Sequence, residues 1–115
     1  MATFILDLDG TIVTHGTNDL LPGADRLLKD ISAGGHQIIF TTRRGDDYKF
    51  NHIYSRGSTI KLIDSLVKEY SLTVLSTVFN CDSPRIVVND DGCKSINHPR
   101  NQDIEYSVNQ ILSTI

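Results

Sequence analysis

Short apolar runs that alternate with segments of helical periodicity constrain the fold of this chain more than any other feature of the sequence. The runs are largely apolar rather than half-polar, which is typical of strands buried on both faces of a parallel sheet. They cover residues 3–8, 36–41, 72–79 and 86–88. Alternation of such strands with helices predicts an α/β fold, a three-layer Rossmann-like arrangement with a mainly parallel sheet of about four to five strands.

Three segments with apolar residues at helical spacing lie between or after these runs. Their expected starts are Pro22, Ser58 or Thr59, and Asp103. Proline is favoured in a first helical turn, and Ser, Thr and Asp are favoured N-caps. The first helix is expected to stop at Gly34–Gly35 and the second at about Tyr70. Residues 43–57 are polar and are expected to form a loop that can contain a short helix.

Length, charge and cysteine content exclude several classes of protein. A chain of 115 residues suits one compact domain, expected to span residues 1–115. The net charge is −3 and the basic residues are scattered apart from Arg43–Arg44, so no dedicated nucleic-acid surface is expected. No apolar stretch approaches the roughly 20 residues of a membrane helix, and the first strand leaves no room for a signal peptide, so a cytoplasmic location is expected. Cys81 and Cys93 are expected to be reduced thiols.

The segment Asp7-Leu8-Asp9-Gly10-Thr11 follows the first apolar run and carries the strongest indication of function. Carboxylates at i and i+2 of a strand end point to the same side, because side chains alternate with period two. Gly10 allows a sharp turn, and Thr11 offers a hydroxyl group. Such carboxylates can hold Mg²⁺ together with a substrate phosphate, and one of them can attack that phosphate.

Two further strand ends are expected to meet this segment. Ligand sites of open α/β sheets lie beyond the carboxyl ends of the strands, so the turns after three of the runs should lie together. Thr41 and Thr42 follow the second run and offer hydroxyl groups for a phosphoryl oxygen. Asp90 and Asp91 follow the fourth run, and a bound divalent cation would offset their mutual repulsion.

The order of these elements resembles that of the haloacid dehalogenase (HAD) superfamily of aspartate-nucleophile phosphohydrolases, over residues 7–97. The resemblance implies a Mg²⁺-dependent phosphatase in which Asp7 forms an aspartyl-phosphate and Asp9 acts as general acid and then base. It further implies that Mg²⁺ is bound by Asp7, by the backbone carbonyl of Asp9 and by Asp90 or Asp91. Thr41, with backbone N–H groups near Asp9 and Gly10, would hold the phosphoryl group.

The basic residue that such enzymes use to neutralise the phosphate has two candidates here, Lys61 and Arg85. A Lys-Pro pair often precedes the last acidic motif in small members of the superfamily, whereas this chain has Pro84–Arg85 at that place. Arg43 is a candidate for substrate contact, together with Gly10, Thr11 and Thr42. The choice between Lys61 and Arg85 stays open at the level of sequence.

Neither insertion point of the superfamily holds enough residues for a cap domain, so the resemblance implies a capless, open site. An open site suits a phosphorylated macromolecule, or a sugar phosphate if a second subunit or residues 43–57 cover it. Three alternatives remain: a weakly active or inactive phosphate-binding module, a receiver-like signalling domain and a phosphomutase. The receiver is disfavoured because its acidic pair and phospho-acceptor lie on different strands, and the mutase because no cap would exclude water.

Overall fold

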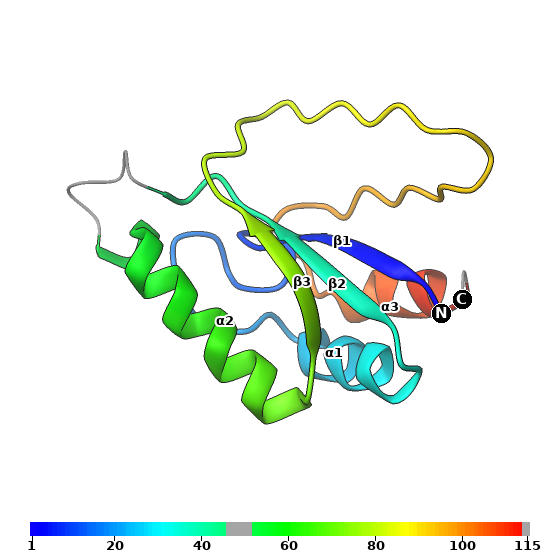
Figure 1. The fold of residues 1–115 in the computed structure, drawn as a ribbon, viewed down its shortest axis with the longest axis horizontal. Helices are drawn as coiled ribbons and strands as arrows, with labels where there is room; N and C mark the ends of the chain where they lie inside the picture. The colour runs from blue at the N-terminus through cyan, green and yellow to red at the C-terminus, as the bar shows by residue number, and fades with distance from the viewer. Residues whose placement is uncertain (46–51, 114–115) are drawn as a thin grey trace.

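The computed structural model describes residues 1–45 and 52–113, and its centre is a parallel sheet of three strands (Figure 1). The strands are β1 (Thr3–Asp7), β2 (Gln37–Thr41) and β3 (Thr73–Val78), in the order β1-β2-β3. β1 and β2 pair in register from Thr3↔Gln37 to Asp7↔Thr41. The α/β class and the parallel pairing are therefore confirmed.

The described part of the chain has three α-helices, one after each strand, and all three contribute to one apolar core. They are α1 (Ala24–Ala33), α2 (Arg56–Tyr70) and α3 (Glu105–Leu112), and a 3-10 turn, η1 (His52–Tyr54), precedes α2. Fully buried side chains from α1, α3 and the inner face of the sheet meet in this core: Leu27, Leu28, Ile31, Ile38, Phe40, Ile104 and Val108. Residues 46–51 of the expected loop lie outside the described residues.

The helix boundaries agree with the sequence apart from the start of α2 and the N-cap of α3, which is Ile104 rather than the expected Asp103. Gly34 caps α1 as expected, and Asp103 accepts a hydrogen bond from the backbone N–H of Glu105 at the start of α3, at 2.8 Å. α2 begins earlier than predicted, because Ser55 rather than Ser58 is its N-cap. The Ser55 hydroxyl accepts a hydrogen bond from the backbone N–H of Ser58 at 3.1 Å.

The sheet is covered by helices on one face only within the described residues, which corrects the expectation of a three-layer fold. The inner face presents Leu6, Ile38 and Phe40 to the core. On the outer face, Ile5 is 60% exposed and Leu75 is 54% exposed. An uninterrupted apolar run therefore did not mean burial on both faces.

The predicted fourth strand is wrong, and the described sheet has three strands instead of four or five. Residues 86–88 have no regular structure, and their side chains are 64–89% exposed. Figure 1 shows the chain after β3 as a long loop that passes outside the sheet before it returns to α3. Three β-branched residues have a high strand propensity, but propensity reflects packing against a neighbouring strand, and no strand of the described residues pairs with this segment. Among the described helices, none is both long and apolar enough to cross a membrane.

Candidate functional site

Asp7 is the last residue of β1 and lies at the carboxyl end of the sheet. Asp7 is paired in register with Thr41 at the end of β2, and its carboxylate is 36% exposed. The Thr11 hydroxyl donates a hydrogen bond to Asp7 Oδ2 at 3.3 Å. Gly10 has φ +82°, and a Cβ there would lie 2.8 Å from Cγ of Arg100, so this turn requires glycine.

Arg85 is the basic residue that contacts Asp7. Its Nη1 donates a hydrogen bond to Asp7 Oδ1 at 2.5 Å, and its Nε and Nη2 donate to the carbonyl of Cys81 at 3.3 and 2.9 Å. Burial lowers the pKa of the Arg85 guanidinium, but the hydrogen bond to Asp7 and the charge of Asp7 outweigh burial and raise it. A permanently charged group therefore lies beside the exposed carboxylate.

Asp9 has a different partner, Arg44, which the sequence analysis did not single out. Nε and Nη2 of Arg44 donate to the two carboxylate oxygens of Asp9 at 2.9 and 2.8 Å. The Arg44 side chain is fully buried, whereas its neighbour Arg43 is 64% exposed and pairs with Asp82 at 3.5 Å. The sequence analysis chose Arg43 as the candidate for substrate contact and gave no indication that Arg44 is the buried arginine, because the difference between the two arises only where the chain turns after β2.

The other predicted residues lie in different surroundings. Thr42 is buried, and its hydroxyl accepts a hydrogen bond from the backbone N–H of Arg44 at 3.0 Å. Lys61 is exposed on α2, where it lines an open hollow with Asn18 and His52. Asp90 and Asp91 are both exposed within the long loop after β3. The structure thus groups Asp7 with Thr11, Thr41 and Arg85 and pairs Asp9 with Arg44, whereas Lys61 lies on α2 and the second acidic pair lies in the long loop.

The donor atoms fit Mg²⁺ in part. Mg²⁺ prefers oxygen ligands and is often bound by one or two carboxylates, a substrate phosphate and water. Among the hydrogen bonds between described residues, Asp7 Oδ2 has just the long contact from Thr11, so this oxygen can serve as such a ligand. Within residues 1–45 and 52–113, no three acidic, histidine or cysteine side chains converge. A third carboxylate is therefore not in place beside Asp7 and Asp9.

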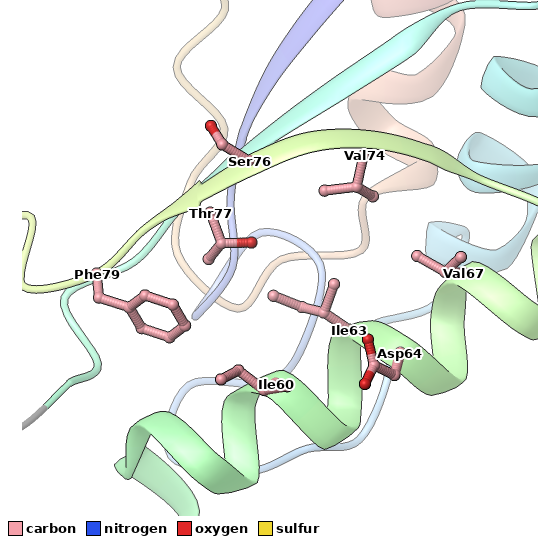
Figure 2. A pocket seen from close by; sticks show the side chains of 8 residues that line it. All are labelled: Ile60, Ile63, Asp64, Val67, Val74, Ser76, Thr77 and Phe79. Atoms are coloured by element: carbon pink, nitrogen blue, oxygen red, sulfur yellow. The ribbon is translucent and has the colours of Figure 1, made fainter.

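An apolar groove lies elsewhere, between α2 and β3, and differs in character from this site. Figure 2 shows its lining, which includes Ile60, Ile63, Val74 and Phe79, with the Asp64 carboxylate on the helix side. Neither Asp7 nor Asp9 lines the groove. The polar cluster at the ends of β1 and β2 is therefore the candidate site for chemistry on a phosphate.

Comparison with known proteins gives a likeness of fold. No family profile and no curated protein matches the sequence. A crystal structure of D,D-heptose 1,7-bisphosphate phosphatase from B. bronchiseptica, complexed with magnesium and phosphate, matches 81% of this chain at 16% identity and a TM-score of 0.52. The chain spans about half the length of that phosphatase, 54%. At this identity the match shows an α/β fold similar to that of a phosphatase.

A second structure, of a target protein from Vibrio cholerae, matches 99% of this chain and 98% of its own chain. The identity is 20% and the TM-score is 0.46, so this likeness carries no further argument.

Proposed function

We propose that this protein hydrolyses a phosphomonoester through an aspartyl-phosphate on Asp7. The observation that carries the proposal is the exposed Asp7 carboxylate at the carboxyl end of β1, with the Arg85 guanidinium hydrogen-bonded to it. Ligands of open α/β sheets bind at such strand ends. The phosphatase of similar fold and the resemblance to HAD enzymes support the same class of reaction.

In the proposed reaction, an Asp7 oxygen attacks phosphorus while the bond from phosphorus to the alcohol oxygen breaks. Arg85 stabilises negative charge on the phosphoryl oxygens, and Thr41 donates a hydrogen bond to one of them. Asp9 gives a proton to the leaving alcohol. Water then attacks phosphorus, Asp7 leaves as a carboxylate, and Asp9 takes the proton of that water.

Mg²⁺ is the proposed cofactor, held by Asp7 and the backbone carbonyl of Asp9. When bound, it supplies further positive charge for the phosphoryl oxygens. Asp90 or Asp91 as a third ligand stays a prediction. A phosphorylated sugar or a phosphorylated macromolecule is the proposed substrate.

Turnover of p-nitrophenyl phosphate with and without Mg²⁺ tests the proposal. Asp7→Asn should reduce turnover below about one thousandth of the wild-type value, because the nucleophile is lost. Asp19→Asn, which removes an exposed carboxylate of the following loop, is the matched control and should keep full turnover. Acid-quenched wild type should carry one phosphoryl group on Asp7 by mass spectrometry. Phosphate binding without turnover would instead identify a phosphate-binding module.

A further inference from the structure

We propose that Arg44 is a positioning residue that fixes the carboxylate of Asp9 for the two proton transfers. This inference rests on the proposed function and adds a residue that neither the motif nor the fold comparison assigns. Arg44 would act on the reaction only through Asp9, because its guanidinium is fully buried and cannot touch the substrate.

All five N–H groups of the Arg44 guanidinium have an acceptor. Besides the two bonds to Asp9, Nη1 donates to Asn18 Oδ1 at 2.6 Å and to the carbonyl of Ile53 at 3.2 Å. Nη2 also donates to the carbonyl of Thr17 at 2.7 Å. The planar guanidinium has five donors in a fixed geometry, so these contacts define its position and its plane.

The acceptors come from three segments of the chain. Asp9 follows β1, Thr17 and Asn18 belong to the loop before α1, and Ile53 belongs to η1. The ring of Tyr54 lies 5.3 Å from the Arg44 guanidinium carbon and adds a cation–π contact. The residues that fix the position of Arg44, and through it that of Asp9, therefore do not include Asp7 or Arg85.

This geometry leaves Asp9 able to react. An ionised carboxylate has about four lone-pair positions, and the paired bonds from Arg44 use two of them. Asp9 is 13% exposed, so the remaining positions can carry the proton that goes to the leaving alcohol in the first step and accept a hydrogen bond from the attacking water in the second. A displacement of about 1 Å in a reacting group can reduce a rate about 100-fold, which makes such fixation valuable.

A contribution to stability alone is a weaker explanation. Burying an ion pair removes two charges from water, and apolar replacements of such pairs are often neutral or stabilising. The two explanations differ in kinetics. A positioning residue should affect kcat through Asp9, whereas a stabilising residue should affect the amount of folded protein.

Kinetics of p-nitrophenyl phosphate hydrolysis by folded Arg44→Lys and Arg44→Ala test the inference. Both should lower kcat about 100-fold with KM within about threefold of wild type, because the paired hydrogen bonds are lost and the substrate contacts remain. Added guanidinium ion should restore kcat of Arg44→Ala about tenfold. Arg26→Lys and Arg26→Ala, at an ion-paired and half-exposed arginine of α1, are matched controls and should retain wild-type kinetics.

The decisive measurement is the same substitution in an Asp9→Asn background. If Arg44 acts through Asp9, Arg44→Lys should change kcat of Asp9→Asn less than twofold, because the target of positioning is already lost. An equal loss in both backgrounds, or wild-type kcat in folded Arg44→Ala, overturns the inference.

If the Arg44 variants fail to fold, Asn18→Ala tests the inference in their place. It removes an exposed acceptor of Nη1 and retains the ion pair, and it should lower kcat several-fold at unchanged KM. Unchanged kcat in that variant also overturns the inference. If the wild type shows no Asp7-dependent turnover, the proposed function itself is refuted. This outcome is distinct from a failure of the inference about Arg44 alone.

Discussion

Asp7 and Asp9 are neighbours in the sequence motif, but their surroundings are unlike. The alternation of side chains predicted that both would point to one side, yet Asp9 lies beyond the last residue of β1. Asp7 is partly open to solvent beside Arg85, whereas Asp9 is held by the buried Arg44. The motif could be predicted from sequence, but the partner of each carboxylate could not, because Arg44 and Arg85 come from segments 35 and 78 residues away.

Arg85 should matter for the rate because it neutralises charge at Asp7. Arg85→Gln should lower kcat/KM for p-nitrophenyl phosphate about 10²- to 10³-fold, the usual effect of losing one group that stabilises developing charge. Arg26→Gln is the control and should be within about twofold of wild type. Steady-state kinetics at fixed ionic strength provide the comparison, and equal values for the two variants would contradict a role for Arg85.

Tyr70 should make the folded state sensitive to alkaline pH. Burial, followed by the charges of Glu69 and Asp25, raises the pKa of its hydroxyl above the usual 10.0. The folded state holds this proton more tightly than the unfolded state. The stability that this group contributes is therefore fully present below pH 10.0 and is lost as the pH rises through the folded pKa. Above pH 10.0, the free energy of unfolding measured in urea should fall more steeply with pH for wild type than for Tyr70→Phe, which has no such proton. Parallel curves for the two proteins would refute this.

At the scale of elements, helices were more predictable than strands. The helices α1 and α2 each have an apolar stripe of at least two turns, so periodicity located them and only the cap of α2 was misplaced. The segment 86–88 has just three apolar residues, too few for any periodicity to be read. Its lack of a partner is a tertiary property that a local pattern does not contain.

The N-cap of α2 gives a direct test of where this helix begins. Ser55→Ala removes the acceptor of the Ser58 N–H and should lower the free energy of unfolding by about 1 kcal/mol. Ser65→Ala, at an exposed interior position of the same helix, should raise it by a few tenths of a kcal/mol, since alanine is the better helix former. Urea denaturation of the two variants should therefore show shifts of opposite sign.

At the scale of the whole molecule, stability should come from one side of the sheet. Leu28→Ala, at a fully buried position of α1, should lower the free energy of unfolding by about 2–5 kcal/mol. Val87→Ser, in the exposed loop after β3, should change it by less than about 0.5 kcal/mol. Denaturant titrations of both variants decide the point. A large loss in Val87→Ser would mean that this segment is packed in solution.

The set of contacts around Arg44 has an evolutionary consequence. Asp9, Asn18 and Arg44 form one hydrogen-bonded unit although they are far apart in the chain. A change at one of these positions alone leaves a buried donor or charge without its partner, so single changes should be selected against. Natural variants of this chain are therefore expected to exchange these three residues together, as a correlated set of substitutions.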